Sequence, residues 1–252
     1  MIVSLARRLR KDARITVMTG AGVSAASGVP TFRGPDGLWK QFRPETLATP
    51  EAFARDPRLV WEWYDWRRQA IAACEPNAAH HVLAAWSRTF PAFQLITQNV
   101  DGLHESAFAK ATARQAGPSD IIRLHGSIWD VSCWKKCPGS PPRWRDDTAP
   151  FVQIPPECPH CHGLIRPGVV WFGEELDPDV LDRASAATEC DAFFTIGTSA
   201  LVYPAAGFVD MARRNGAFTV EINPDATPAS STVALSIRGA AESVLAEIDG
   251  SR

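Results

Sequence analysis

The chain of 252 residues is long enough for one large domain, or for a large domain with a smaller insert, and either can bury a substantial core. A net charge of −2, with 45% hydrophobic and 21% charged residues, argues against a general nucleic-acid binder and against binding to a charged membrane surface. No apolar run approaches the ~20 residues that a bilayer-spanning helix needs. Six cysteines, four of them in two close pairs, indicate metal binding in an intracellular setting, which we expect to be the cytoplasm.

The segment Arg14 to Gly34 begins with a short apolar run, Ile15 to Met18, that is typical of a buried strand. The run leads into Gly20-Ala21-Gly22 and then into small residues that can start a helix. Glycines let a ligand approach the backbone, and the N-terminus of a helix presents N–H groups to an anion. The segment therefore favours a phosphate-bearing nucleotide, although tight packing also explains a glycine-rich turn. The acidic residue that a dehydrogenase carries about 20 residues later, after a second strand, does not follow.

Four further apolar runs predict strands, and each ends in glycine, amide, hydroxyl or imidazole groups. Because helical segments separate these runs, we predict an α/β fold: a Rossmann-like open parallel sheet with helices on both faces. In such sheets the ligand lies outside the carboxyl ends of the strands, so the endings predict one polar crevice. The runs are Phe93 to Thr97, Ile121 to Leu124, Phe193 to Ile196 and Phe218 to Ile222, and the predicted helices are Thr49 to Ala73, Pro76 to Phe90, Asp179 to Ala187 and Ala205 to Asn215.

Two cysteine pairs, C-x3-C and C-x2-C, are separated by 20 residues and can close one tetrahedral thiolate site. The segment between them is rich in proline and charge, so a metal would supply stability that packing cannot. One Zn²⁺ held by four protein ligands would be structural. His160 and His162 lie close enough to replace the fourth ligand, and four ordinary thiols are the other alternative. The predicted ligands are Cys133, Cys137, Cys158 and Cys161.

We assign the predicted elements to two domains. A large Rossmann-like domain comprises residues 1–45, 75–128 and 168–252, and a small zinc-binding and helical domain comprises residues 46–74 and 129–167. The predicted helix of the small domain is rich in tryptophan and arginine. Such a helix most often buries its aromatic side chains and exposes its arginines. Tyr64 and Arg67 are one turn apart, however, so they can also share a face that lines a pocket.

Six blocks of the sequence resemble, in this order, those of the sirtuins, which are NAD-dependent protein-lysine deacylases. The blocks are GAGVSAASGVPTFRG, TQNVDGLH, the LHG at 124–126, the two cysteine pairs, VVWFGE at 169–174 and GTSALVYPAA at 197–206. The resemblance runs from about the first predicted helix to the last. It implies NAD as a consumed co-substrate, acyl-lysine proteins or peptides as substrates, nicotinamide and O-acyl-ADP-ribose as products, and a monomer.

The resemblance also implies roles for individual residues. His125 would be the general base that draws a proton from a ribose hydroxyl, with Asn99 and Asp101 beside it as catalytic residues. The substrate backbone would bind by β-strand addition along Val170, Trp171, Phe172, Gly173 and Glu174. The residues implied to bind NAD are Gly20, Ala21, Gly22 and Ser24 at the pyrophosphate, Thr31, Phe32, Arg33, Gln98, Asn99 and Asp101 at the ribose and nicotinamide, and Gly197, Thr198, Ser199, Asn223 and Ala241 at the adenosine.

A closer resemblance is to the class III branch, which removes succinyl, malonyl and glutaryl groups from lysine. That branch carries Y-x-x-R, here Tyr64 and Arg67, with a small residue at the position of Ala48 and a threonine at that of Thr31. A guanidinium fork and a phenol hydroxyl together suit a carboxylate. We therefore predict a deacylase for acidic acyl groups. The alternatives are a deacetylase of broader specificity, an ADP-ribosyl transferase and a non-catalytic NAD- and zinc-binding module.

Two segments differ from the common family pattern. The first cysteine pair has three intervening residues where two are usual. After His104, the run Glu105 to Asp120 lacks the usual alanine–glycine and is interpreted as a longer loop near the crevice.

Overall fold

The computed structural model describes residues 2–32, 37–38, 43–112 and 121–252. Its largest feature is a sheet of six parallel strands in the order β3-β2-β1-β7-β8-β9. The strands are β1 (Ile15–Thr19), β2 (Phe93–Thr97), β3 (Ile121–Arg123), β7 (Ala192–Ile196), β8 (Phe218–Asn223) and β9 (Leu235–Arg238). The chain passes from β1 to β2 and β3 on one side and returns to β7 on the other. This reversal is the place where ligands bind in open α/β sheets.

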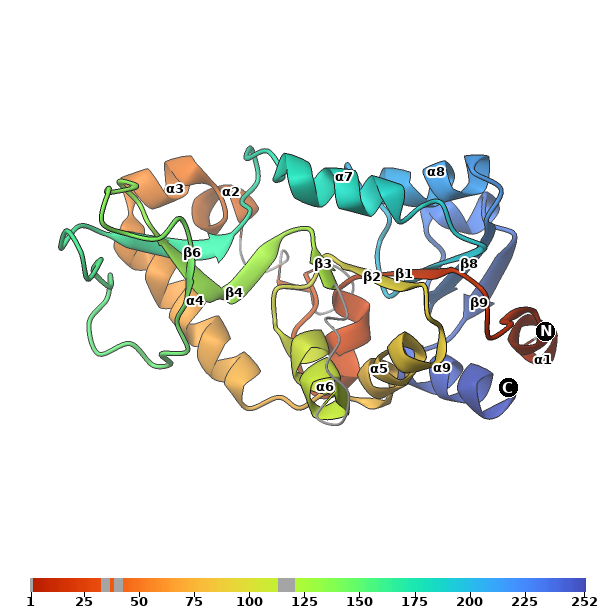
Figure 1. Ribbon diagram of the computed structural model, residues 1–252. Coiled ribbons are helices and arrows are strands. Elements are labelled where there is room, and N and C mark those ends of the chain that lie inside the picture. The colour runs from red at the N-terminus through yellow and green to blue at the C-terminus, as the bar shows by residue number, and fades with distance from the viewer. Residues whose placement is uncertain (1, 33–36, 39–42, 113–120) are drawn as a thin grey trace.

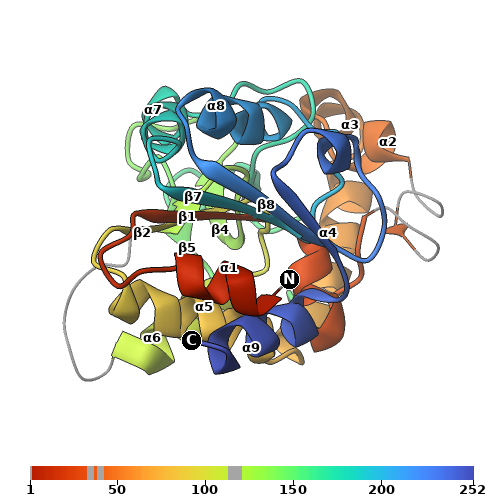
Figure 2. The same ribbon diagram turned by 90° about the vertical axis from the view of Figure 1, so that its right-hand side faces the viewer.

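Helices cover both faces of this sheet, as Figure 2 shows. On one face lie α1 (Ile2–Arg8), α5 (Ala78–Thr89), α6 (Leu103–Thr112) and α9 (Ala241–Gly250), and on the other lie α7 (Pro178–Ala186) and α8 (Phe208–Arg214). Consecutive residues of β7 serve opposite faces, because Phe193 packs in one core cluster and Phe194 in the other. Burial on both faces explains why these strands appear in the sequence as continuous apolar runs. The predicted fold class is confirmed.

A second sheet, which the sequence did not predict, lies at the other end of the molecule (Figure 1). It is antiparallel, with the order β5-β4-β6. Phe53, Trp61, Trp129 and Trp171 belong to the core that this sheet shares with its neighbouring helices. The elements of this small domain are β4 (Gly126–Cys133), β5 (Trp144–Arg145), β6 (Ile165–Val169), α2 (Pro44–Leu47), α3 (Pro50–Arg55) and α4 (Pro57–Ala72).

Three predicted helices differ from the structure. The helix predicted from Thr49 to Ala73 is broken at Asp56, whose carboxylate caps α4 by accepting from the Leu59 N–H at 3.0 Å. The break is caused by Pro57, because the residue before a proline avoids helical geometry. The helix expected after Gly20-Ala21-Gly22 is a 3₁₀ helix, η1 (Ala21–Ser27), and it already includes Gly22. The helix predicted from Ala205 to Asn215 divides into η3 (Ala205–Gly207) and α8.

The interpretation of Glu105 to Asp120 as a long loop is partly wrong. Residues 105–112 continue α6, and 113–120 lie outside the described residues. In the described ranges, the structure contains no helix with the length and apolar character needed to cross a bilayer.

Candidate active site

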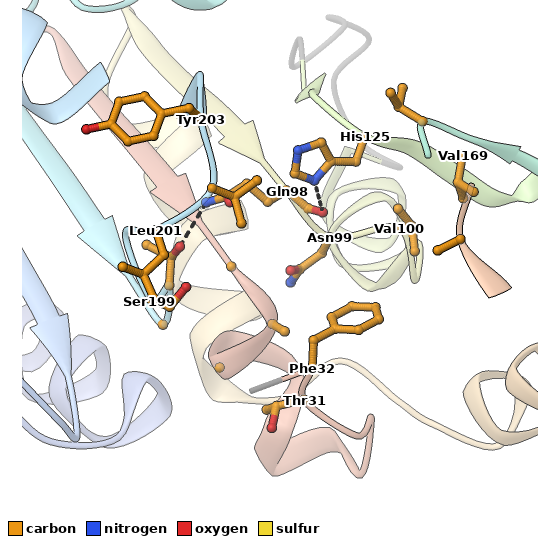
Figure 3. A pocket seen from close by; sticks show the side chains of 18 of the residues that line it. Thr31, Phe32, Gln98, Asn99, Val100, His125, Val169, Ser199, Leu201 and Tyr203 are labelled. Carbon is orange, nitrogen blue, oxygen red and sulfur yellow. Dashed lines mark hydrogen bonds between the residues drawn. The ribbon is translucent and has the colours of Figure 1, made fainter. Parts of the chain in front are cut away.

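A cavity of about 1180 Å³ runs along the carboxyl ends of β1, β2, β7 and β8 and continues between the large sheet and α4. Figure 3 shows side chains from several of these elements facing it. Ser24 and Asp101 lie behind its wall, and Arg33 lies outside the described residues. The predicted site residues that line the cavity are Gly20, Ala21, Gly22, Thr31, Phe32, Ala48, Tyr64, Arg67, Gln98, Asn99, His125, Val170, Trp171, Phe172, Gly173, Glu174, Gly197, Thr198, Ser199, Asn223 and Ala241.

The first glycine loop packs directly on the loop that follows β7. A Cβ on Gly22 would lie 2.8 Å from the Cα of Gly197, and a Cβ on Gly197 would lie 2.6 Å from the backbone N of Val23. Gly197 also has a φ of +59°, which favours glycine. The N–H of Gly20 donates to the Ile196 carbonyl at 3.0 Å, and that of Gly22 donates to the Gly197 carbonyl at 2.8 Å. These two N–H groups join the loops, so tight packing, the alternative weighed from the sequence, accounts for part of the motif.

Gln98 and Thr198 join the two halves of the cavity floor. The Gln98 side-chain amide donates to the Thr198 hydroxyl at 3.0 Å, and the Asn223 amide donates to the Thr198 carbonyl at 3.0 Å (Figure 3 shows the first of these bonds). The endings of β2, β7 and β8 are therefore held together by side chains of the predicted site.

A buried polar network supports Asn99 from behind. The Asn99 amide donates to the Ser24 hydroxyl oxygen at 3.3 Å, and the Ser24 hydroxyl donates to Asp101 at 2.8 Å. His80 Nδ1 accepts from the Asn77 backbone N–H at 3.2 Å, so Nε2 carries the ring proton and faces Ser24 Oγ at 3.4 Å. Burial lowers the pKa of His80 to about 4 and raises that of Asp101. As contacts of NAD, Ser24 and Asp101 stay predictions.

His125 follows β3 and is fixed by one backbone contact. Its Nδ1 lies 3.0 Å from the carbonyl oxygen of Gln98, which can only accept, so Nδ1 carries the proton (Figure 3). In the neutral ring, Nε2 is then the basic nitrogen. Burial lowers the pKa of His125, and the bond to Gln98 opposes this shift only in part. The imidazole is therefore neutral at neutral pH, which is the form that a general base requires.

Tyr64 and Arg67 of α4 line the end of the cavity that borders the small domain. Arg67 is 6% exposed, and its guanidinium lies 4.7 Å from the ring centre of Phe32 and 4.9 Å from that of Trp63. The Tyr64 hydroxyl accepts from the indole N–H of Trp171 at 2.9 Å. The structure thus contradicts the solvent-exposed alternative for Arg67, and both side chains share one buried face.

The Glu174 carboxylate already accepts hydrogen bonds from other residues of the chain. Arg166 forms a two-pronged pair with its carboxylate, with Nη2 2.9 Å from Oε2, and the Trp171 backbone N–H donates to the same oxygen at 2.8 Å. Arg166 also stacks on the Trp171 ring at 3.7 Å. The turn that contains Phe172 is further held by its N–H, which donates to the Ala48 carbonyl at 2.9 Å. Glu174 therefore shapes the wall of the cavity.

The four cysteines of the two pairs form one cluster, with all Sγ atoms within 4.8 Å of one another. Cys133 Sγ lies 3.7 Å from Cys161 Sγ, and Cys137 Sγ lies 3.9 Å from Cys158 Sγ. Zinc–thiolate bonds of about 2.3 Å in a tetrahedron require S···S separations of about 3.8 Å. The donor set and its spacing fit one structural zinc ion. No position is left for water, so the metal is not catalytic.

The extra residue in the first pair is accommodated by the backbone. Lys136, just before the second cysteine, has a φ of +48°, and its N–H donates to the Cys133 carbonyl at 3.0 Å. His160 and His162 are not members of the cluster, so the cysteines alone supply the ligands.

Several lining residues were not singled out from the sequence. Val100 and Tyr203 lie inside the quoted blocks TQNVDGLH and GTSALVYPAA, which already contained the signal for them. Trp63 lies next to Tyr64, with ring centres 4.8 Å apart, but the sequence presents it as one tryptophan of a packing stripe. Asp182 of α7 reaches the cavity without any local signal.

Comparison with known proteins agrees with this geometry. The sequence model described as "Sir2 family" matches residues 20–204. An "NAD-dependent protein deacylase" from Aquifex aeolicus is 51% identical over 219 residues, covering 86% of each chain. An "NAD-dependent protein deacylase 1" from Caldanaerobacter subterraneus subsp. tengcongensis is 48% identical, covering 90% of this chain and 88% of the relative. A solved "Sir2 homolog-NAD complex" is 42% identical with a TM-score of 0.85, covering 99% of this chain and 93% of the other. The chain belongs to the Sir2 family.

Proposed function

We propose that the protein is an NAD-dependent protein-lysine deacylase that prefers succinyl, malonyl and glutaryl groups to acetyl. Deacylation with NAD is supported by the names of the relatives and by the solved NAD complex. The acyl preference is carried by Arg67. Its guanidinium is 6% exposed and lines the cavity, and among the described residues Asp101 acts on it electrostatically but no carboxylate forms an ion pair with it.

A buried cation without an anionic partner is costly, and an anionic ligand removes that cost. Burial lowers the pKa of Arg67, and the nearby Tyr64 and Asp101 oppose this shift, so the side chain stays charged. An acyl carboxylate at the guanidinium would gain charge-assisted hydrogen bonds worth about 1.5–3 kcal/mol each. The free energy of one such bond corresponds to a preference of roughly tenfold to hundredfold over a neutral acyl group.

Tyr64 adds a donor to the same end of the cavity. Its oxygen already accepts from the Trp171 indole, so its own proton is left to donate. Burial, the largest influence, raises the pKa of Tyr64 to about 12, which keeps the hydroxyl protonated at neutral pH. A protonated phenol beside an arginine fork suits a carboxylate and offers no comparable advantage to the methyl group of acetyl.

At the other end of the acyl chain, NAD would supply the ribose that receives the acyl group as nicotinamide leaves. His125 would take a proton from a ribose hydroxyl through Nε2, while the Gln98 carbonyl holds Nδ1–H and so fixes the tautomer. Asn99, which lines the cavity and is held by Ser24, would orient the ribose.

The test uses the purified zinc-loaded protein, NAD and an equimolar mixture of one peptide carrying succinyl-, malonyl-, glutaryl- or acetyl-lysine. Mass spectrometry follows each acyl group and nicotinamide release. We expect the acidic acyl groups to be removed first, with one nicotinamide formed per acyl group lost. Acetyl removed as fast as succinyl would overturn the acyl preference. Nicotinamide release with ADP-ribose attached to protein, and no acyl loss, would instead indicate an ADP-ribosyl transferase.

A conservative variant at Tyr64 separates the contribution of the hydroxyl from that of the ring. Tyr64→Phe retains the packing on Trp63 but removes both the proton that is free to donate and the oxygen that accepts from the Trp171 indole. We expect the KM for the succinyl peptide to rise about tenfold and that for the acetyl peptide to stay within about twofold.

A further inference from the structure

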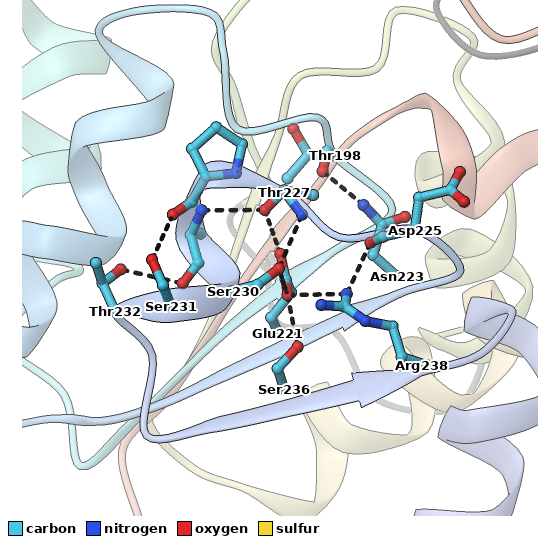
Figure 4. Close-up of polar contacts among 12 residues, drawn as sticks. Thr198, Glu221, Asn223, Asp225, Thr227, Ser230, Ser231, Thr232, Ser236 and Arg238 are labelled. Atoms are coloured by element: carbon cyan, nitrogen blue, oxygen red, sulfur yellow. Dashed lines mark hydrogen bonds and ion pairs between the residues drawn. The ribbon is translucent and has the colours of Figure 1, made fainter.

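Glu221 of β8 is a buried carboxylate that the deacylation chemistry does not use. It is 1% exposed and does not line the cavity. Its oxygens accept from four side chains (Figure 4), two on the segment after β8 and two on β9. Those bonds come from Thr227, from Ser230 at 2.6 Å, from Ser236 at 2.7 Å and from Arg238 at 3.2 Å.

Two of these donors form a reciprocal cap around the short 3₁₀ helix η4 (Pro228–Ser231). Thr227 Oγ1 accepts from the Ala229 N–H at 3.1 Å, and Ser230 Oγ accepts from the Thr227 N–H at 2.8 Å. Because each hydroxyl oxygen already accepts from the backbone, its proton is free for another acceptor. Both protons go to Glu221, which therefore selects the closed shape of this turn.

Arg238 links Glu221 to the start of the segment that follows β8. One of its Nη1 protons is directed at Glu221 and another at the backbone carbonyl of Asp225, 2.7 Å away. Burial favours the neutral acid, but the hydroxyl donors and Arg238 outweigh it, so the pKa of Glu221 is lowered. The carboxylate is ionised at neutral pH and attracts all four donors.

The segment held by Glu221, residues 224–231, forms part of the cavity wall with its first five residues. Pro224, Asp225, Ala226, Thr227 and Pro228 all line it, directly after the predicted adenosine contact Asn223. We propose that Glu221 is a positioning residue for NAD: it keeps residues 224–231 in the shape that receives the adenosine end, without touching the cofactor. This inference rests on the proposed use of NAD.

The test compares Glu221→Gln with the unaltered zinc-loaded enzyme. The amide has nearly the same size, but its NH₂ group would face the hydroxyl protons of Thr227 and Ser230. Those hydroxyls cannot turn their oxygens toward the NH₂ group without losing the backbone N–H groups that close the cap. We expect the KM for NAD at saturating peptide to rise about tenfold, with kcat and the KM for the peptide within about twofold. Titration calorimetry should show the Kd of ADP-ribose rising by the same factor.

A purely structural role predicts a different result. A lower Tm with unchanged KM for NAD and unchanged Kd for ADP-ribose would overturn the inference, and so would a rise in the KM of the peptide alone. If Glu221→Gln does not fold, Ser230→Ala removes both the Glu221 bond to Ser230 and the cap bond from the Thr227 N–H, and it should raise the Kd of ADP-ribose about threefold to tenfold. An unchanged Kd in that variant contradicts the inference.

Ser236→Ala is the matched control, because Ser236 binds the same carboxylate from β9 and lies outside the held segment. Its Kd for ADP-ribose should stay within about twofold of the unaltered protein, and a rise equal to that of Ser230→Ala would overturn the inference. Calorimetry measures the binding of ADP-ribose and does not require that the protein removes acyl groups. Failure of acyl removal with ADP-ribose binding weakened by Glu221→Gln would refute the proposed function and leave this inference intact.

Discussion

The two sheets of the molecule are stabilised in different ways. The central strands of the large sheet are buried on both faces, and β1 and β7 consist only of buried residues. The small sheet has three strands, one of them only two residues long, and lies beside the cysteine cluster. The large sheet therefore depends on apolar packing, whereas the small domain depends on a metal, aromatic rings and the buried Arg68.

That arginine shows the contrast most clearly. Arg68 of α4 is 0% exposed and donates to the carbonyl of Ile128 at 2.8 Å, to that of Thr148 at 3.1 Å and to the carboxylate of Asp146 at 3.3 Å. It joins the helix to β4 and to the segment after β5. The neighbouring Arg67 faces the cavity instead. Consecutive arginines thus have separate tasks, one within the fold and one at the site.

The largest expected effect comes from the metal. Cys158→Ser should lose the zinc ion, disorder the small domain and abolish acyl removal, because metal binding supplies much of such a domain's folding free energy, about 10–16 kcal/mol in zinc-finger peptides. Zinc content, near-ultraviolet circular dichroism and activity are the readouts. Cys190→Ser, a buried cysteine outside the cluster, should keep its zinc. A full equivalent of zinc in Cys158→Ser, with unchanged dichroism, would contradict this account.

The large sheet should respond to a loss of packing. Phe194 is 0% exposed, and its ring lies 5.6 Å from that of Trp86. Phe194→Ala should lower the free energy of unfolding by about 3–5 kcal/mol, measured by urea denaturation. The comparison would fail if this variant lost zinc before the sheet unfolded, or if the change were under about 1 kcal/mol.

Arg68→Met tests the polar link of the small domain. The variant removes the Arg68 donors to two carbonyls and to Asp146, which keeps only the Thr148 N–H, so we expect a loss of about 1–3 kcal/mol in the free energy of unfolding. Arg68→Lys retains the charge but cannot reach three acceptors with one planar fork, and it should recover only part of the loss. A stability equal to that of the unaltered protein would show that the arginine is dispensable.

The smallest effect concerns pH. Burial lowers the pKa of His125 from its ordinary value of 6.5, so the ring keeps its basic form as the pH falls through 6.5. Activity should therefore decline only at lower pH, with the midpoint of the acid limb of kcat/KM below 6.5. His81→Ala, at an exposed position, should leave this limb in place. A midpoint at or above 6.5 would contradict the burial of a neutral base.

The large sheet was more predictable from the sequence than the small one, because the two sheets are stabilised in different ways. Strands buried on both faces are continuous apolar runs, so β1 and β7 were visible within a residue or two. In contrast, β9 includes Ser236 and Arg238, whose partner is Glu221, and β6 contains Pro167 and Gly168, which argue against a strand. Such elements depend on contacts with distant residues, which a local pattern does not contain.

The site was predictable where a motif fixes a residue to a strand ending. His125 and Asn99 follow strands, and both reach the cavity as expected. Ser24 and Asp101 lie one layer behind, because side-chain direction after a turn depends on packing. The pairing of Glu174 with Arg166 was equally invisible, since the sequence does not show which acid is already satisfied.

The measurement that tests the central claim most directly is the ratio of kcat/KM for succinyl and acetyl forms of one peptide, compared between the unaltered protein and Arg67→Met. The buried guanidinium, which pairs with no carboxylate among the described residues, predicts a ratio of about ten or more that falls to about one or below in Arg67→Met. Arg58→Met, the same change at an exposed position of α4, should leave the ratio unaltered. A ratio that is the same in the unaltered protein and in Arg67→Met would contradict the claim that Arg67 binds the acyl carboxylate.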